Sequence, residues 1–387
     1  MKVAERVKRL PGEGAIEVLA RALALEAEGA DIIHLEVGEP DFKTPANILE
    51  AGIRALEAGD TRYGPAPGIP ELREAIAQDL SVRLGIEVKP EEVVVTPGGK
   101  AIAFFAFLAL LEPGDEVIYT NPGFPVYEAM TDFIGAKGVP LRLLEERGFR
   151  FEVDDFLSKV SPKTKLIVIN SPHNPTGSVL TKSDLEMVAE VAVERGLWVL
   201  SDEVYNRIIY EGEYLSIASL PGMQRRTIIL NSFSKSYAMT GWRLGFGIMP
   251  PELASHITRL VINSNSCTPP FIQRAGIEAL KGPQETVTRM VASFRERREV
   301  IVEGLNSIEG LRTVKPQGAF YVFPNIEGVG MGSREFAGYL LKEAGVALLP
   351  GTAFGDYGEG FIRISYANSL DNIRKALDRI SKAVARL

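Results

Sequence analysis

The chain has 387 residues, of which 45% are hydrophobic and 24% are charged. These values are ordinary for a globular protein and exclude disordered and fibrous classes, and the length allows two structural domains. The net charge of −7 argues against a binding surface for nucleic acid or for an anionic membrane.

The first 20 residues lack the apolar core of a signal peptide. The most apolar run, 104–111, is too short to span a bilayer and is expected to be a buried helix. The single cysteine, Cys267, suits a reducing compartment. We therefore expect a cytoplasmic protein that has neither a membrane nor a nucleic acid as partner.

Short β-rich runs alternate with helical patterns from about residue 91 onward. Strands are expected at 93–96, 116–120, 166–170, 198–202 and 227–232. One of the helices between them has Thr181 or Ser183 to cap its start and Gly196 to end it. Apolar strands separated by helix-length segments predict an α/β fold, a mostly parallel sheet with helices on both faces.

The C-terminal part has a different pattern, with long helical segments and fewer, more separated strands. Strands are expected within GAFYVF, VALLP and FIRIS, with a helix at 333–345 and another at the end. This α+β pattern predicts a smaller second domain at 281–387. We expect the large domain at 43–280, and the N-terminal segment 1–42 is expected to join the small domain.

Unusual polar residues follow the expected strands. Because ligands bind beyond the carboxyl ends of the strands in open parallel sheets, these residues should gather on one edge. They are Gly98, Gly99 and Lys100 after the first strand, Phe124 after the second, Asn174 after the third, Asp202 at the end of the fourth, and Ser232 at the end of the fifth.

Several of these groups can bind a phosphate. The backbone N–H groups at the helix start after Gly98 and Gly99 are suited to an anion, and glycine allows it to approach closely. The Ser232 and Ser234 hydroxyls and the Arg243 guanidinium supply further donors. The pattern predicts a phosphate site at this edge.

The remaining groups suit an aromatic aldehyde. Lys235 beside a phosphate can form a Schiff base. Asp202 ends an apolar strand, and such a buried carboxylate needs a cationic partner such as a pyridinium nitrogen. Asn174 and Tyr205 can donate to a phenolate oxygen, and Phe124 can stack on a ring. Together these groups describe pyridoxal 5′-phosphate.

Three motifs, SPHNPTG at 171–177, SDEVY at 201–205 and SFSKSYAMTGWRLGF at 232–246, carry a family resemblance. In this order and spacing the chain resembles the class I/II aminotransferases, which are pyridoxal-phosphate enzymes of fold type I, and among them the prokaryotic aspartate and aromatic types. The resemblance extends from VGEPDF to FIRISYA. It implies a homodimer with shared active sites and a ping-pong transfer of an amino group between an L-amino acid and a 2-oxo acid.

The resemblance also implies residue roles. Lys235 holds the internal aldimine and shuttles a proton, Asp202 keeps the pyridine nitrogen protonated, and Tyr205 and Asn174 bond the ring oxygen while Phe124 stacks on the ring. The cofactor phosphate is bound by Gly98, Gly99, Ser232, Ser234 and Arg243, with Lys100 at the same turn and Tyr63 reaching the partner subunit's phosphate.

For the substrate, the resemblance gives Arg363 to the α-carboxylate, assisted by the Gly38 backbone and Asn174. Lys100 resembles a lysine that meets the distal carboxylate of acidic substrates, so 2-oxoglutarate is expected to be one acceptor.

Other functions fit the sequence less well. A nicotinamide dehydrogenase needs G-x-G-x-x-G, which TPGGKAIAFF does not supply. His34, His173 and His256 are too scattered for a zinc site, so no metal is expected. A regulator that senses the cofactor would need a DNA-binding module, for which the chain before VGEPDF is too short. A β-lyase of the same fold type shares nearly all cofactor residues and stays the alternative.

Overall fold

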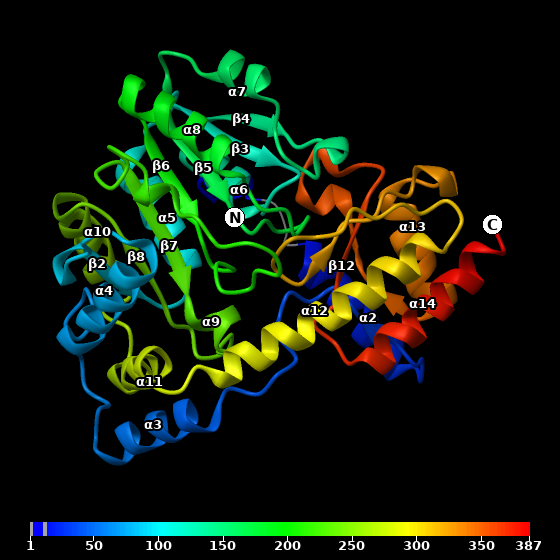
Figure 1. Ribbon diagram of the computed structural model, residues 1–387, viewed down its shortest axis with the longest axis horizontal. Helices are drawn as coiled ribbons and strands as arrows, with labels where there is room; N and C mark the ends of the chain where they lie inside the picture. The colour runs from blue at the N-terminus through cyan, green and yellow to red at the C-terminus, as the bar shows by residue number, and fades with distance from the viewer. Residues whose placement is uncertain (1–2, 11–13) are drawn as a thin grey trace.

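The computed structural model describes residues 3–10 and 14–387 (Figure 1). Its largest sheet has seven strands in the order β2-β8-β7-β6-β5-β3-β4. They are β2 (Val93–Thr96), β3 (Glu116–Asn121), β4 (Lys137–Arg142), β5 (Thr164–Asn170), β6 (Trp198–Asp202), β7 (Thr227–Ser232) and β8 (Gly245–Ile248). The neighbouring strands are parallel except that β8 is antiparallel to both β2 and β7. The prediction of a mostly parallel sheet is confirmed.

Two strands of this sheet were not predicted from the sequence. The β4 sequence KGVPLR lies at the edge of the sheet and is only partly buried, so it lacks a continuous apolar run. The β8 sequence GFGI contains two glycines, which are more typical of turns. A Cβ atom on Gly245 would lie 2.2 Å from the backbone nitrogen of Gly99, so the absence of a side chain lets these two backbones meet.

Helices cover both faces of the large sheet because successive strand residues point to opposite faces. On one face, Val117, Leu166 and Leu200 pack in a cluster with residues of α5 (Lys100–Leu110), α6 (Val126–Ile134) and α10 (Pro251–Ser264). On the other face, Ile118 and Ile167 pack with residues of α7 (Val153–Lys159) and α8 (Lys182–Arg195). Near β2, a further cluster joins α4 (Pro70–Leu84) and α11 (Pro270–Lys281), beside which lies α3 (Ala46–Glu57).

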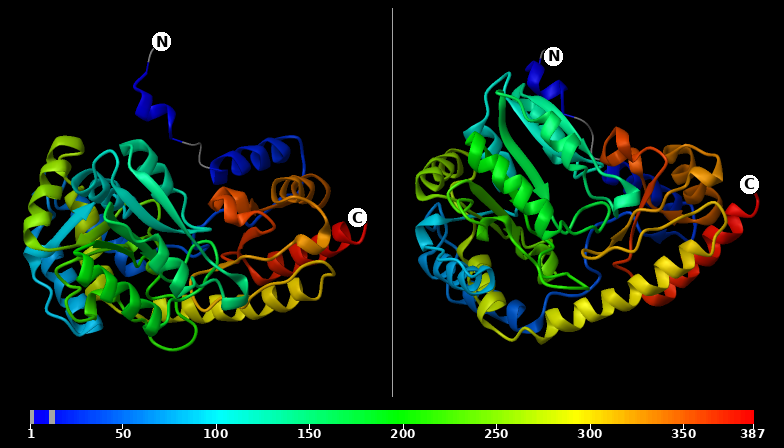
Figure 2. Two further views of the ribbon diagram at one scale, coloured as in Figure 1. Left: turned by 90° about the horizontal axis from the view of Figure 1, so that it is seen from above. Right: turned by 45° about the horizontal axis from the view of Figure 1, so that its top comes forward.

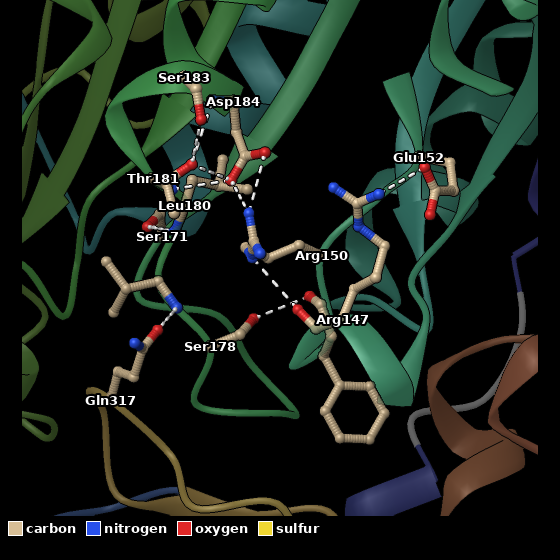
Figure 3. Close-up of polar contacts among 12 residues, drawn as sticks. Arg147, Arg150, Glu152, Ser171, Ser178, Leu180, Thr181, Ser183, Asp184 and Gln317 are labelled. Atoms are coloured by element: carbon tan, nitrogen blue, oxygen red, sulfur yellow. Dashed lines mark hydrogen bonds and ion pairs between the residues drawn. The ribbon is translucent and has the colours of Figure 1, made fainter. Parts of the chain in front are cut away.

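The ends of α8 follow the sequence signals. Thr181 is the N-cap residue, and its hydroxyl accepts a hydrogen bond from the backbone nitrogen of Asp184 at 3.2 Å. The Asp184 carboxylate in turn accepts from the Thr181 backbone and lies 3.1 Å from the Arg150 guanidinium (Figure 3). Gly196 ends the helix in the left-handed conformation, with a φ of 69°. Thr181 rather than Ser183 is therefore the cap.

The C-terminal part forms a second layer, which α12 (Glu285–Asn306) joins to the region of the large sheet (Figure 1). Here β9 (Tyr321–Val322), β11 (Leu349–Pro350) and β12 (Ile362–Ser365) form an antiparallel sheet in the order β11-β12-β9. The helices α13 (Ser333–Tyr339) and α14 (Leu370–Val384) share an apolar cluster with α12, centred on buried residues such as Phe294, Phe336 and Ile373.

The N-terminal segment contacts both layers. β1 (Ile33–His34) pairs in parallel with β10 (Val346–Ala347), and Ala22 of α2 (Gly14–Ala27) packs against Leu341 and Ala347. The short helix α1 (Glu5–Lys8) instead lies against α6, where the Arg6 guanidinium is 6.0 Å from the Phe133 ring. Figure 2 shows α1 apart from α2. The boundaries 1–42, 43–280 and 281–387 stay a prediction.

None of the helices within residues 3–10 and 14–387 combines the length and the apolar character needed to cross a bilayer.

Candidate functional site

A cavity of about 310 Å³ lies at the carboxyl ends of the large sheet, facing the second layer. It brings together most of the residues that the sequence predicted for the site. These are Gly38, Gly99, Lys100, Phe124, Asn174, Asp202, Tyr205, Ser232, Ser234, Lys235, Arg243 and Arg363. Gly98 does not line the cavity but lies directly behind Arg243, whereas Tyr63 lies outside it and is 90% exposed.

The charged groups of the lining are mostly basic. They are Lys100, Lys235, Arg243 and Arg363 against the single carboxylate of Asp202. Because like charges in a partly dehydrated cavity repel one another, the arrangement favours a ligand that carries several negative charges.

One end of the cavity is formed by the turn between β2 and α5. Gly98 has a φ of 84°, and a Cβ atom there would lie 2.2 Å from Nη2 of Arg243, so only glycine allows the guanidinium to lie against the turn. Ser232 ends β7 and caps the short helix α9 (Phe233–Ser236), where its Oγ accepts from the backbone nitrogen of Ser234 at 3.3 Å. Two hydroxyls and a guanidinium therefore face the N-terminus of α5, an arrangement that suits a phosphate.

Lys235 extends from α9 into the middle of the cavity. Its Nζ donates a hydrogen bond to the backbone carbonyl of Gly38 and lies 6.0 Å from the ring centres of Tyr205 and Phe320. Burial lowers the pKa of Lys235 to about 8, and the nearby positive charge of Arg363 contributes to this shift. A substantial fraction of Lys235 is therefore neutral, and so nucleophilic, at mildly alkaline pH.

Asp202 ends β6 and is buried beneath the cavity. The hydroxyl of Tyr127 donates a hydrogen bond to its Oδ2, and the backbone nitrogen of Val204 donates to its Oδ1 at 3.2 Å. Burial raises the pKa of Asp202 to about 6, although these two hydrogen bonds act in the opposite direction. Among the described residues this carboxylate has no ion pair, and a buried charge needs a cationic partner.

Arg363 reaches the cavity from β12 and is buried. Its Nη1 donates to the Asn174 side-chain oxygen at 3.2 Å, and its Nη2 donates to the backbone carbonyl of Glu36. Its Nε is also buried but finds no acceptor among the described residues. An unsatisfied donor of this kind is costly, so an anionic acceptor in the cavity would stabilise the arrangement.

Two tyrosines of the site were missed from the sequence. Tyr127 lies in the first turn of α6, three residues after Phe124, where no strand end marks it. Tyr321 lies in β9, and its hydroxyl is 2.7 Å from that of Tyr205. A Cβ atom on Gly38 would lie 2.3 Å from the Tyr321 hydroxyl, which explains a glycine at this position. The burial of both tyrosines is set by tertiary contacts, and their local sequence carries no signal for it.

Comparison with known proteins gives a consistent result. The sequence model described as aminotransferase class I and II matches residues 30–380. The chain is 43% identical over 386 residues to the aspartate aminotransferase of Pyrococcus horikoshii, covering 99% of this chain and 97% of that protein. It is 43% identical to aromatic-amino-acid aminotransferase 2 of Thermococcus litoralis, and the match covers 94% of this chain and 93% of that protein.

The solved structures agree with these sequence matches. The structure of the aspartate aminotransferase from Thermus thermophilus with maleate superposes with a TM-score of 0.95 at 40% identity, over 99% of this chain and 100% of that one.

Proposed function

The chain belongs to the aminotransferase class I and II family and is a pyridoxal-phosphate-dependent aminotransferase, and we propose that glutamate and 2-oxoglutarate are one of its substrate pairs. The observation that carries the proposal is the cavity itself. It combines the buried Lys235 amine with the buried Arg363 guanidinium, whose Nε has no acceptor among the described residues, and with Lys100 at its rim.

The donor set of the cavity fits the cofactor. The turn at Gly98, the Ser232 and Ser234 hydroxyls and Arg243 would hold the phosphate, because a side chain on Gly98 would displace the guanidinium. We assign Asp202 to the pyridine nitrogen, since this buried carboxylate has no ion pair in the part of the chain that the structure describes. We assign Asn174 and Tyr205 to the ring oxygen and Phe124 to the ring face. Pyridoxal phosphate supplies an aldehyde that reacts with amino groups and a ring that withdraws electrons from the bonds then broken.

Proton transfer is the role that we assign to Lys235. Lys235 would carry the cofactor, and its amine, once the amino group of the substrate has displaced it, would move a proton between the substrate Cα and the aldehyde carbon of the cofactor. Its lowered pKa supports this role, because a base must be neutral to accept a proton near its working pH. The surrounding rings of Tyr205 and Phe320 limit the access of water to Lys235.

Arg363 is our choice for the substrate α-carboxylate. Its planar guanidinium can bind two carboxylate oxygens, and the hydrogen bond from its Nη1 to Asn174 fixes its orientation. The guanidinium carbon also lies 4.6 Å from the centre of the Tyr321 ring, so the Arg363 side chain is already held in place and loses little conformational freedom when it binds a carboxylate. Asn174 and the backbone at Gly38 would assist at the same carboxylate.

Lys100 supports an acidic side chain on the substrate. Its Nζ lies 5.6 Å from the centre of the Phe124 ring, at the rim of the cavity, where it could meet a distal carboxylate. The relative solved with maleate, itself a dicarboxylate, and the relatives named for aspartate are consistent with this role. The relative named for aromatic amino acids leaves room for a second, neutral class of donor.

The β-lyase alternative is not favoured, because the relatives reported above are named aminotransferases.

We also propose that the protein works as a cytoplasmic homodimer in which Tyr63 completes the partner's site. Tyr63 is 90% exposed, and α3 displays the apolar side chains of Leu49, Ile53 and Leu56, each about 45% exposed, at helical spacing. Mixing two inactive variants, Lys235→Ala and Tyr63→Ala, should then restore roughly a quarter of wild-type activity, since half of randomly formed dimers are hybrids with one intact site.

The direct test of the proposed function is a transfer assay with the purified, cofactor-loaded protein. Glutamate is offered with oxaloacetate, pyruvate or phenylpyruvate, and the formation of 2-oxoglutarate is followed. Borohydride reduction should fix the cofactor mass on the peptide that contains Lys235, and Lys235→Ala should abolish both this label and the transfer. If glutamate formed no 2-oxoglutarate with any of the three acceptors while another amino acid donated its amino group, the proposed pair would be wrong, and a label on another lysine would contradict the role of Lys235.

A further inference from the structure

A second cavity, of about 630 Å³, lies away from the site described above, between the C-terminal end of α4, the segment after β6 and the first half of α12. Three arginines line it, one from each of these elements: Arg83, Arg207 and Arg295. Its size is typical of a small-molecule site. None of its lining residues belongs to the aminotransferase cavity.

Two of these arginines lack a carboxylate partner. Arg83 is paired with Asp79 of the same helix, whose carboxylate accepts from the Arg83 Nε at 2.9 Å. Arg207 donates to the Tyr237 hydroxyl, and Arg295 donates to the backbone carbonyl of Tyr210 at 2.6 Å. Within residues 3–10 and 14–387, neither of the two has an ion pair, and Glu213 is the one acidic residue in the lining. The cavity thus keeps an excess of positive charge.

The lining also contains a buried amide. Asn206 lines the cavity and is only 6% exposed, and its Nδ2 is buried without an acceptor among the described residues. Buried donors are almost always satisfied in folded proteins, so this one calls for an acceptor that the protein itself does not supply. Because this Nδ2 is closed to solvent, an oxyanion bound by Arg207 and Arg295 would reach it only if the Asn206 side chain turned toward the cavity.

A third cavity, of about 300 Å³, shows what a compensated cluster looks like (Figure 3). It also contains arginines, but Arg147 lies 2.5 Å from Glu152 and Arg150 lies 3.1 Å from Asp184. These ion pairs neutralise the guanidinium groups and explain their positions without a ligand, although the Nε of Arg147 is also buried without an acceptor among the described residues. The same explanation does not apply to Arg207 and Arg295.

We propose that the cavity between α4 and α12 binds a phosphate group, either as free phosphate or as a phosphomonoester. The guanidinium groups of Arg207 and Arg295 both line this cavity, and a guanidinium fork can bind a phosphate in a bidentate manner. The volume exceeds what a lone phosphate fills, so a phosphorylated metabolite is expected to bind more tightly. This site is separate from the cofactor phosphate site at Gly98 and Arg243.

The test uses the holoenzyme, so that the cofactor already fills its own phosphate site. Binding of inorganic phosphate and of ribose 5-phosphate is measured by isothermal titration calorimetry at constant ionic strength. We expect one saturable site per chain. Arg207→Gln and Arg295→Gln should each weaken binding about tenfold or more, as expected for losing a charge-assisted hydrogen bond. Arg289→Gln is the matched control, because Arg289 is exposed on the same helix α12 but does not line the cavity.

The outcomes separate clearly. Tighter binding of ribose 5-phosphate supports a phosphomonoester, and equal binding of both probes supports free phosphate. Binding that is absent, or that persists unchanged in Arg207→Gln and Arg295→Gln, would overturn the site. Circular dichroism of each variant checks that it folds, and Arg295→Gln carries the test if Arg207→Gln does not fold. Since the readout is binding rather than transfer, its failure is distinguishable from failure of the proposed aminotransferase activity.

Discussion

The two halves of the cavity are built differently. The cofactor half is formed by the ends of β2, β6 and β7 and by the turn at Gly98. In the large sheet β6 and β7 are neighbours, and β8 lies between β7 and β2. The substrate half takes Arg363 from β12 and Gly38 from the segment after β1, so it exists only when the second layer lies against the sheet. The first half is a property of one sheet, and the second is a property of the contact between two layers.

Hydrogen bonds between the two halves of the cavity fix their relative position. Lys235 donates to the carbonyl of Gly38, and Arg363 donates to Asn174. Substitutions in the cofactor half should therefore affect every reaction of the enzyme, whereas substitutions in the substrate half should affect substrates according to the group that each residue meets.

The largest effect is expected in the cofactor half, for Asp202→Asn. The amide cannot stabilise a proton on the pyridine nitrogen by charge, so kcat should fall by about 10³-fold or more, which corresponds to roughly 4 kcal/mol. Single-turnover absorbance with several amino acids checks this, and the loss should be the same for all of them. Circular dichroism provides the control for folding. Activity within about threefold of wild type, or ~0.7 kcal/mol, would show that Asp202 has another role.

The next effect is expected in the substrate half, for Arg363→Lys. An ammonium keeps the charge but loses the two-pronged geometry and leaves Asn174 without its donor. We expect kcat/KM to fall about 100-fold, or roughly 3 kcal/mol, for every amino acid alike, while cofactor binding is unchanged. Steady-state kinetics with glutamate, alanine and phenylalanine distinguish the possibilities. If only glutamate were affected, Arg363 would belong at the distal end of the cavity.

A smaller effect concerns the coupling between the halves. The pKa of Lys235 is about 8 in the folded protein, against an ordinary value of 10.5, because of burial and of Arg363. Below pH 8 Lys235 is protonated in both the folded and the unfolded state, and burying its charge lowers the free energy of unfolding by the full amount. Between pH 8 and 10.5 the unfolded state binds more protons than the folded state, so the free energy of unfolding rises with pH. In the cofactor-free protein, Lys235→Met should be more stable than wild type at pH 7.

That stability difference should also depend on pH. It should shrink by about 1 kcal/mol between pH 7 and pH 9, as the folded wild type loses the proton of Lys235. Urea unfolding at the two pH values measures it, and comparison with the variant cancels the contributions of other titrating groups. A difference that does not change with pH would mean that Lys235 is not held in a desolvated position by the contact between the layers.

The same contrast explains what the sequence could predict. The five strands found from apolar runs belong to the large sheet, and their ends place Asp202 and Ser232 without knowledge of tertiary structure. The strands β4 and β8 were missed because an edge position and two glycines remove the apolar signal. Tyr127 and Tyr321 were missed because their roles arise from contacts with Asp202 and Tyr205, which lie 75 and 116 residues away in the chain. Gly38 was expected through the family resemblance, and Arg363 both through that resemblance and because apolar residues alternate around it in FIRIS, but no local pattern links β12 to the large sheet.

The most selective effect is expected for Lys100, which follows the turn of the cofactor half and lines the cavity. As a cation in the first turn of α5 it lies at the unfavourable end of the helix dipole, at a cost of a few tenths of a kcal/mol, which an acidic substrate would offset. Lys100→Met should reduce kcat/KM for glutamate and aspartate by about 1–3 kcal/mol and leave phenylalanine unchanged or improved. Competition between glutamate and phenylalanine in one assay gives the ratio directly, with Lys100→Arg as the control that keeps the charge. Equal losses for the two amino acids would place Lys100 with the cofactor half, as a residue that supports the phosphate turn and takes no part in selecting the side chain.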